Sequence, residues 1–297
     1  MSSKKIWLVD SNIYVFRSWY KNPKSLENKD KKCVNAVHGF IDFVYHLLSQ
    51  EQPQNIGFAF DESLKKSHRR EIYPQYKANR KSASPDLRYQ FKLCRKFLRL
   101  MGLAEFGSRY YEADDIIGTL AHYYRQKMYQ IILITADKDL AQLIHENDIW
   151  WEYIQNKKMN YRAIKKKFGV RPDQIADLLA IAGDKSDNIP GVPDIGVSTA
   201  ALLLKRFDNL ENLIASIPEI GKSKIRRAKY LQNQIEQHVE QIRLSRRLTE
   251  IVCDAHDAPF EQSLRRNVEK VDIEKIWSFF EYLNYPVVDR QKWLNKM

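Results

Sequence analysis

The chain has little cysteine, no long apolar run, and no glycine-rich loop of the kind that binds nucleotide phosphates. Its three cysteines, Cys33, Cys94 and Cys253, lie far apart and never form a Cys-x-x-Cys pair. This pattern argues against a disulfide scaffold and a zinc knuckle and favours a reducing compartment. The longest apolar runs, such as residues 131–134, are far shorter than the ~20 residues of a membrane helix, and Asp10 ends the first one too early for a secretory signal. We therefore expect a soluble globular protein of the cytoplasm, with no membrane partner.

Positive charge is abundant and unevenly distributed. The 297 residues include 49 lysines and arginines against 37 aspartates and glutamates, which gives a formal net charge of +12. Residues 65–99 hold twelve basic and two acidic side chains, and residues 205–247 hold ten basic and five acidic ones. Either block alone is also typical of a solvated face, but two blocks around an acid-rich middle favour a polyanionic partner.

Three short apolar segments rich in β-forming residues indicate strands at 6–9, 56–60 and 131–135, and helical spacing at 34–48 and 115–127 lies between them. Strands that alternate with helices predict an α/β fold with a parallel sheet. Each strand segment is closely followed by an aspartate, namely Asp10, Asp61 or Asp137. Singly, each is also typical of a helix cap or turn. Together they indicate one crevice at the carboxyl edge of the sheet, where such folds bind ligands.

The rest of the chain divides into an excursion, a helical region and a tail. Residues 62–90 are basic, contain two prolines and follow no clean period, which is typical of a long functional insertion. From about residue 170 only helical patterns follow, one from Pro172 to Ala182 and one over 198–207. We predict an α/β core at 1–170 and a helical region at 171–297, whose C-terminal aromatic residues, including Trp277 and Trp293, belong to the core.

Nine carboxylates fall in four sequence regions: Asp10, Asp61, Glu112, Asp114, Asp115, Asp137, Asp139, Asp184 and Asp187. Those at 112–115 also suit a helix N-terminus, and Asp139 suits an N-cap. Converging acids repel one another unless hard divalent cations such as Mg²⁺ or Mn²⁺ bind their oxygens. An EF-hand is excluded, because Ile189 and Ile195 stand where that loop needs glycine and glutamate. Carboxylate-bound metal beside concentrated Lys and Arg indicates hydrolysis of phosphodiester bonds, and hence a nuclease.

The motifs that carry these residues resemble the 5′ nucleases, the family of the exonuclease domain of bacterial DNA polymerase I and its stand-alone and phage flap-endonuclease relatives. The matching strings are Leu8-Val-Asp10, Phe58-Ala-Phe-Asp61, Tyr76-Lys77-Ala-Asn-Arg80, Tyr111-Glu-Ala-Asp-Asp115, Ile134-Thr-Ala-Asp-Lys-Asp-Leu140, Arg171-Pro-Asp-Gln174 and Gly183-Asp-Lys-Ser-Asp-Asn-Ile-Pro-Gly191. They occur in the family's order over residues 5 to 260. The resemblance implies a PIN-like, mostly parallel sheet flanked by helices, a basic helical arch at about 62–90, and a helix-three-turn-helix at about 173–207. It also implies a free-standing nuclease, since no polymerase follows.

The resemblance further implies a two-metal site that takes two Mg²⁺ ions, with Mn²⁺ as a substitute. Asp10, Asp61, Glu112, Asp114 and Asp115 would surround the first ion, and Asp137, Asp139, Asp184 and Asp187 the second. Lys77 and Arg80 would be the catalytic basic residues of the arch. Arg69 and Arg70 would contact DNA, and the ring of Tyr76 would stack on a splayed base rather than pack in a loop.

The stretch 191–200 resembles the turn of the helix-three-turn-helix that grips duplex DNA. Gly191, Gly196, Ser198 and Thr199 would contact DNA there, and in such relatives the turn also holds K⁺ through backbone carbonyls. A turn that enters a helix presents free N–H groups to phosphate. This chain has Pro193-Asp194 where many relatives carry Lys-Gly. Lys205, Arg206, Lys222 and Lys224 would compensate for this loss, with Lys205 and Arg206 as further DNA contacts.

We expect a Mg²⁺-dependent, structure-specific nuclease that acts as a monomer on branched DNA with a 5′ single-stranded arm and a duplex. Two alternatives stay open at this point. One is a non-catalytic branched-DNA-binding protein on the same fold, and the other is a related Mg²⁺-dependent ribonuclease acting on an RNA–DNA hybrid.

Overall fold

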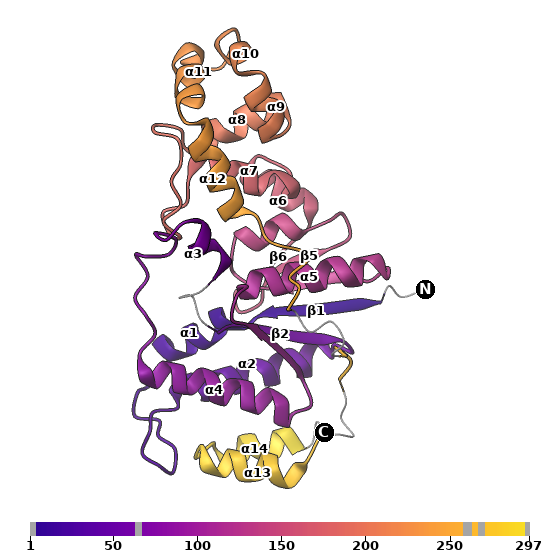
Figure 1. Ribbon diagram of the computed structural model, residues 1–297. Coiled ribbons are helices and arrows are strands. Elements are labelled where there is room, and N and C mark those ends of the chain that lie inside the picture. The colour runs from indigo at the N-terminus through magenta and orange to yellow at the C-terminus, as the bar shows by residue number, and fades with distance from the viewer. Residues whose placement is uncertain (1–3, 63–66, 258–262, 267–270, 295–297) are drawn as a thin grey trace.

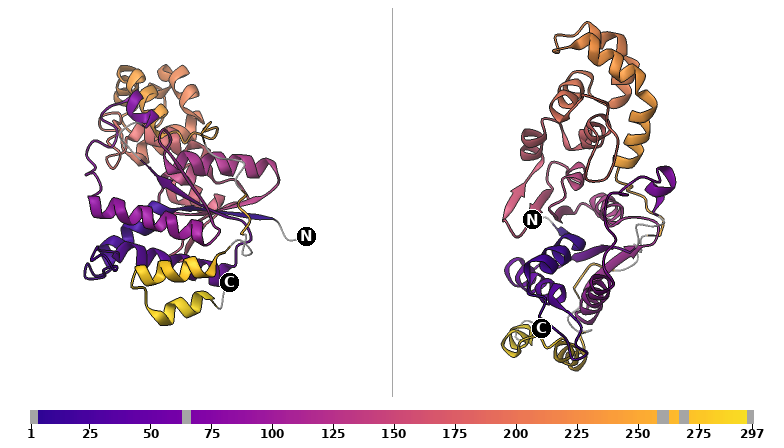
Figure 2. Two further views of the ribbon diagram at one scale, coloured as in Figure 1. Left: turned by 60° about the horizontal axis from the view of Figure 1, so that its bottom comes forward. Right: turned by 90° about the vertical axis from the view of Figure 1, so that its left-hand side faces the viewer.

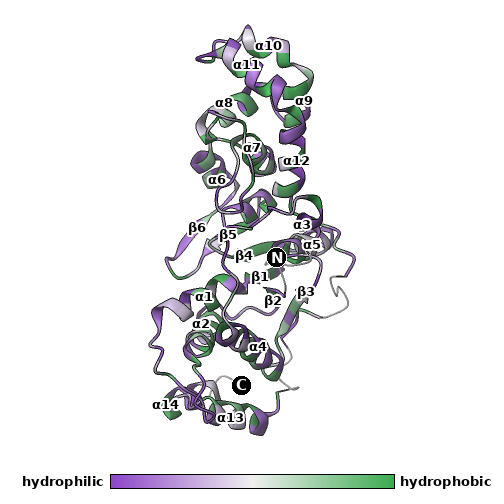
Figure 3. Ribbon diagram, turned by 60° about the vertical axis from the view of Figure 1, so that its left-hand side comes forward, coloured by the Kyte–Doolittle hydropathy of each residue, from purple (hydrophilic) through white to green (hydrophobic). Residues whose placement is uncertain are grey.

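The centre of the molecule is a six-stranded sheet, seen in a computed structural model that describes residues 4–62, 67–257, 263–266 and 271–294. The strands are Lys5–Asp10 (β1), Ile56–Asp61 (β2), Ala104–Ser108 (β3), Gln130–Ile134 (β4), Ile149–Glu152 (β5) and Lys157–Met159 (β6). Their order is β3-β2-β1-β4-β5-β6, and all neighbours are parallel except β5 and β6. The chain order reverses beside β1, which therefore lies at the topological switch point where α/β sheets bind ligands. The edge strand β6 carries Lys157 and Lys158 and is hydrophilic (Figure 3), which discourages pairing with another chain.

Helices cover both faces of the sheet and extend beyond it (Figure 1). They are Ser11–Lys21 (α1), Asn35–Glu51 (α2), His68–Ile72 (α3), Pro85–Leu100 (α4), Ala113–Gln126 (α5), Tyr161–Phe168 (α6), Ile175–Ala182 (α7), Val197–Phe207 (α8), Leu210–Ala215 (α9), Ile217–Gly221 (α10), Ala228–Gln237 (α11), Val239–Thr249 (α12), Ile273–Tyr282 (α13) and Val287–Leu294 (α14). Two short 3₁₀ helices span Asp139–Leu143 (η2) and Pro172–Gln174 (η3).

Alternate residues of each central strand enter two different cores. On β1, Trp7 and Val9 pack with α1, α2, α4, α13 and α14, whereas Ile6 and Leu8 pack with α5 and the helices that follow β6. A parallel sheet buried on both faces needs continuous apolar strands, and this explains why β1, β2 and β4 were recognisable in the sequence. The predicted strands at 6–9, 56–60 and 131–135 and the predicted helices at 34–48, 172–182 and 198–207 are confirmed.

The 62–90 excursion is shorter than the sequence predicts. Its residues 63–66 lie outside the described part of the chain, and the rest forms α3 and a series of turns up to residue 80. Residues 85–90 belong to α4, where Ser84 caps the helix by accepting from the Leu87 N–H and Pro85 occupies the first turn. Leu87 and Gln90 are buried against the core, so this part covers the sheet instead of forming an arch.

The C-terminal tail packs with the α/β core and not with the helical region to which its position in the sequence assigned it. Phe279, Phe280 and Trp293 are buried in the same cluster as α2 and α4. Figures 1 and 2 show α13 and α14 at one end of the molecule and α9, α10 and α11 at the other. The expectation that the tail aromatics are core residues is confirmed for these three. Within the described ranges, no helix is long and apolar enough to span a bilayer.

Candidate active site

Four aspartates meet at the carboxyl edge of the sheet, around the switch point. Asp10 ends β1, Asp61 ends β2, Asp114 lies in the first turn of α5, and Asp137 follows β4. The Thr135 hydroxyl donates to Asp10 Oδ2 at 2.9 Å. Two donors hold Asp61: Asn12 Nδ2 lies 2.6 Å from Oδ2, and the backbone N–H of Ala113 lies 2.8 Å from Oδ1. These bonds orient the carboxylates but bring no positive charge to them.

These four aspartates and the neighbouring Asp139 are called the inner group below. Their surroundings oppose ionisation of the carboxyl groups. Burial, with added repulsion from Asp137, raises the pKa of Asp10 to about 8. Burial, again with Asp137 as the leading charge, raises the pKa of Asp139 to about 8 and that of Asp114 well above its ordinary value. Burial also raises the pKa of Asp61 and of Asp137. Desolvated carboxylates that raise one another's pKa mark a place where a cation would be strongly bound.

A second group of acids, called the outer group below, is neutralised by basic side chains. Arg69 makes a forked contact to Asp115, with both nitrogen–oxygen distances 2.7 Å, and reaches Glu112 at 3.0 Å. Asp115 also accepts from the N–H groups of Glu112 and Val252, at 3.1 and 2.9 Å. Burial opposes the charge of Glu112, but Lys77 and Arg69 outweigh it and lower the pKa of that carboxyl to about 2.

The segment after α3 brings further cations to these acids. Lys77 Nζ lies 2.7 Å from Glu112 Oε1 and 3.5 Å from Asp187 Oδ2, and only 5% of the residue is exposed. Arg80 forms an ion pair with Asp187 but keeps 43% of its side chain exposed. Lys77 has a φ of +52°, and its N–H donates to the Asp187 carbonyl at 2.8 Å. The backbone of this segment is therefore fastened to the loop that carries Asp187.

That loop, residues 183–196, holds two of the expected ligands. Asp184 and Ile189 exchange backbone hydrogen bonds of 3.0 and 2.8 Å, so the loop begins as a tight hairpin. Gly183 has a φ of +76°, and a Cβ there would meet the Gly191 nitrogen at 2.5 Å. Both glycines are required by this close approach. Burial opposes the charge of Asp184, but hydrogen bonds from Ser186 and Lys138 prevail and lower its pKa.

The donor chemistry of the site fits hard divalent cations. The candidate ligands of the inner group are carboxylate oxygens alone, and Asp139 Oδ1 is buried with no hydrogen-bond partner in the described part of the chain. Yet among the described residues no three His, Cys, Asp or Glu side chains form a metal-ligand cluster as they stand.

The helix-three-turn-helix region presents a separate surface. Gly196 precedes the first turn of α8, and a Cβ added to it would meet nothing within 4 Å. Ser198 is exposed and Thr199 is half-buried in that first turn, and Lys205 and Arg206 are exposed in the last turn. Asp194 has a φ of +58° and accepts from the Tyr230 hydroxyl at 2.6 Å. An aspartate thus adopts the left-handed conformation that glycine adopts more readily than any other residue.

Five predicted site residues are already engaged within the protein. The Tyr76 ring is 3% exposed and its hydroxyl donates to Glu112 at 2.8 Å, so no face is open to a base. Arg69 is buried against the acids and is not available to DNA, and the oxygens of Asp115 are already engaged by four N–H donors. Gly191 packs against Ala182 and Gly183 instead of facing outward. Arg70, also expected at DNA, is half-buried, and its guanidinium lies 3.4 Å from the Lys77 carbonyl.

Three residues of the site were not predicted from the sequence: Asn12, Thr135 and Lys138. Asn12 and Thr135 orient Asp61 and Asp10, and Lys138 Nζ lies 2.9 Å from Asp184 Oδ2. Asn12 lies two residues after Asp10, and the other two lie in the motif Thr135-Ala-Asp-Lys138. The available signal was therefore their place beside the acids, but not which acid each one contacts.

Comparison with known proteins matches both parts of the chain. The family description "5′-3′ exonuclease, N-terminal resolvase-like domain" matches residues 5–169, and "5′-3′ exonuclease, C-terminal SAM fold" matches residues 170–272. A 5′-3′ exonuclease of Buchnera aphidicola is 37% identical over 83% of this chain and 81% of that protein. DNA polymerase I of Bacillus caldotenax is 37% identical over 99% of this chain, which spans only 32% of that longer protein.

Solved structures share the fold along nearly the whole length. The T5 5′-exonuclease with bound zinc ions has a TM-score of 0.68 and 19% identity, covering 94% of this chain and 99% of that one. The catalytic core of Rad2 in complex with DNA substrate has a TM-score of 0.66 and 15% identity, covering 99% of this chain and 93% of that one. The chain belongs to the 5′-3′ exonuclease family, and it is a nuclease.

Proposed function

We propose that this nuclease is a structure-specific 5′ nuclease that hydrolyses phosphodiester bonds in branched DNA with two divalent ions. Mg²⁺ is the proposed ion and Mn²⁺ its substitute. The observation that carries the proposal is the inner aspartate group beside a buried lysine, Lys77, on a segment rich in basic residues. DNA replication and repair, which produce 5′ arms, are the processes this activity suits.

Asp10, Asp61 and Asp114 would hold the first ion. Asp137 and Asp139 would hold the second, together with Asp184 from the loop 183–196. Bound divalent ions would lower the pKa of a water ligand and stabilise charge on the reacting phosphate. Thr135 and Asn12 hold Asp10 and Asp61 in place before any ion arrives, which lowers the cost of organising the site. Glu112 and Asp187 complete the acidic set when their basic partners move away.

Lys77 and Arg80 would then act on the substrate. Both side chains end in donors that match phosphate oxygens, and both start within reach of the acids. We propose that they leave Glu112 and Asp187 for the scissile phosphate as ions and DNA bind. Their charge would then stabilise the charge that develops on the leaving oxygen.

The duplex part of the substrate would lie on the helical region. The exposed turn at Gly196, with Ser198 and Thr199, offers N–H and hydroxyl donors to a phosphate backbone, and a K⁺ ion held by the turn is part of the proposal. Lys205 and Arg206 lie about 15 Å further along α8, at 1.5 Å per residue. Since neither region alone covers both parts of a branch, a junction of single strand and duplex would be preferred, bound by a monomer in the cytoplasm.

A Mg²⁺ time course on labelled 5′-flap, 3′-flap, single-strand and blunt-duplex substrates of one sequence tests the proposal. We expect incision of the 5′ flap within about one or two nucleotides of the junction, because unpaired nucleotides there reach the site without the cost of unstacking. Equal rates on 5′ and 3′ flaps would contradict it. Binding without cleavage in Mg²⁺ would favour the non-catalytic alternative, and faster cleavage of an RNA–DNA hybrid would favour the ribonuclease.

A further inference from the structure

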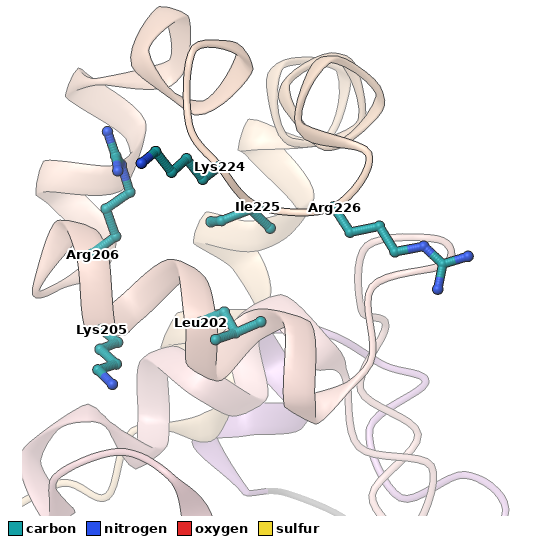
Figure 4. Close-up of a pocket in the computed structure, with 6 residues that line it drawn as sticks. All are labelled: Leu202, Lys205, Arg206, Lys224, Ile225 and Arg226. Atoms are coloured by element: carbon teal, nitrogen blue, oxygen red, sulfur yellow. The ribbon is translucent and has the colours of Figure 1, made fainter.

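The helical region carries a groove, and only two of its lining residues, Lys205 and Arg206, are among the proposed DNA contacts. It lies between the last two turns of α8 and the loop that joins α10 to α11, with a volume of about 410 Å³. Its lining consists of Leu202, Lys205, Arg206, Lys224, Ile225 and Arg226. Figure 4 shows Leu202 and Ile225 one above the other in the centre, Arg206 and Lys224 on one side, and Arg226 on the other.

The four basic side chains of this groove lack acidic partners. Within the described ranges, none of Lys205, Arg206, Lys224 and Arg226 takes part in an ion pair, although neighbouring Lys222 pairs with Glu219 at 2.7 Å. The ends of Arg206 and Lys224 approach each other in Figure 4. Like charges gathered around one opening favour an anionic occupant, whose approach they would also accelerate.

The floor of the groove is apolar, and this limits what the occupant is. Leu202 is 53% exposed, and Ile225 packs on the core from the other side of the opening while remaining partly exposed. A DNA backbone would satisfy the cations, but it offers only the C–H edges of its sugars and no apolar side chain that could enter the groove and cover this floor. An apolar side chain that fills a pocket inside a polar rim is the usual anchor of a peptide.

We propose that the groove binds an acidic peptide segment of a partner protein, with one apolar side chain on Leu202 and Ile225 and carboxylates on the four surrounding cations. Peptide binding itself does not depend on the proposed function. One consequence does: Lys205 and Arg206 are also proposed DNA contacts, so peptide and duplex would compete for them.

A panel of fluorescein-labelled ten-residue peptides tests the proposal with the full chain. Each peptide has five Asp or Glu residues and one Leu, which moves through the positions, and its matched control has Ser in place of Leu. At low salt we expect fluorescence anisotropy to show binding of at least one Leu peptide, and about tenfold weaker binding of its Ser control. A panel in which no Leu peptide binds better than its Ser control would overturn the proposal.

Two variants locate the binding on the protein. Leu202→Ser should weaken peptide binding about tenfold and leave flap cleavage unchanged, because it removes apolar area but no charge. Ile273→Ser is the matched control, since Ile273 is also 53% exposed but lies on α13 at the other end of the molecule. Unchanged peptide affinity in Leu202→Ser would overturn the proposal.

A third variant distinguishes the peptide from DNA. Arg226→Ala should weaken peptide binding and leave the salt dependence of flap-DNA binding unchanged, because Arg226 lines the groove but is not among the proposed DNA contacts. A lower salt slope for DNA in this variant, together with unchanged peptide binding, would assign the groove to the duplex backbone instead. The flap-cleavage assay above is independent of this result, so failure of the peptide proposal and failure of the proposed function are distinguishable.

Discussion

The inner and outer groups of carboxylates lie close together but differ in their surroundings: the outer acids have basic partners within the chain, and the inner acids do not. Asp10, Asp114 and Asp139 are desolvated beside one another and have raised pKa values. Glu112 and Asp115 are buried as well, but Arg69 contacts both and Lys77 contacts Glu112. The inner group therefore stores repulsion that an added cation would relieve, whereas the outer group has its cations built into the chain.

The largest effect is expected from removing the arginine of the outer group. Arg69→Ala leaves Glu112 and Asp115 buried without their shared partner, and breaking a buried ion pair in this way costs about 3–5 kcal/mol. Urea denaturation should show this loss in the free energy of unfolding. Lys222→Ala is the control, because its pair with Glu219 is exposed and removing it should cost less than about 1 kcal/mol. Equal effects of the two substitutions would show that Arg69 is not the cation on which the outer group depends.

For the inner group, Asp10→Asn should reduce flap cleavage in Mg²⁺ by roughly a hundred- to a thousandfold. The amide cannot supply the charge that binds the ion, which is worth several kcal/mol of transition-state stabilisation. Flap binding in EDTA should persist, since without a divalent ion the substitution removes only repulsion between a carboxylate and phosphate. Single-turnover cleavage and anisotropy on the same flap measure both. Near wild-type cleavage would refute the assignment of Asp10 as a ligand.

Lys77 connects the two groups, because its side chain pairs with an outer acid and its proposed role is on the substrate. Lys77→Ala should slow single-turnover cleavage at saturating enzyme about a hundredfold, the scale seen when one donor to developing charge is removed. Lys81→Ala is the matched control on the same segment, where Lys81 is exposed. If Lys77→Ala changed only the affinity for DNA, its catalytic assignment would be wrong.

The comparison also predicts how stability depends on pH in EDTA. The pKa of Asp10 and of Asp139 is about 8 in the folded chain against an ordinary value of 3.8, so the unfolded state releases their protons first. Their contribution is complete below about pH 4; the free energy of unfolding should fall as pH rises from about 4 to about 8, and then level off. Urea denaturation at several pH values should show this fall, with a smaller one in Asp10→Asn and a partial recovery with Ca²⁺. A stability that rises between pH 5 and 8 in EDTA would contradict the raised values.

The smallest effect concerns Tyr76. Tyr76→Phe keeps the ring but removes the hydroxyl that donates to Glu112, so the free energy of unfolding should fall by about 1–2 kcal/mol. Cleavage at saturating enzyme should change little. A base-stacking role predicts the opposite pattern for this substitution and for Tyr76→Leu, namely full stability in the first and slower cleavage in the second.

The sequence predicts the strands and acids of the core well, because both depend on local pattern. β1, β2 and β4 are continuous apolar runs. Because the three strands are parallel, the aspartates at or just after their carboxyl ends are expected at one edge of the sheet. β3 was missed, because its Glu105 is an edge residue whose charge is neutralised by Arg95 and Arg99 from α4. That pairing depends on how α4 packs against the edge of the sheet.

The same limit explains the errors at the site. The charge of Arg69 and the ring of Tyr76 are visible in the sequence, but their direction is not. Arg69 reaches acids more than forty positions away, and Tyr76 contacts Glu112 and Asp187, which lie 36 and 111 positions away. Only the closure of the segment onto α5 and the loop 183–196 decides whether these groups face DNA or the interior.

The loop that joins α7 to α8 has a geometric consequence. Its first turn carries Asp184 and Asp187, and its last residue, Gly196, opens the helix proposed to hold the duplex. The backbones of Gly183 and Gly191 pack closely against each other, which restricts the movement of this loop. In the proposed complex, this loop fixes the distance between the turn that binds the duplex and the acids at which the phosphodiester bond is cut. A nuclease built in this way would select the cleavage site by its distance from the junction and not by the base sequence.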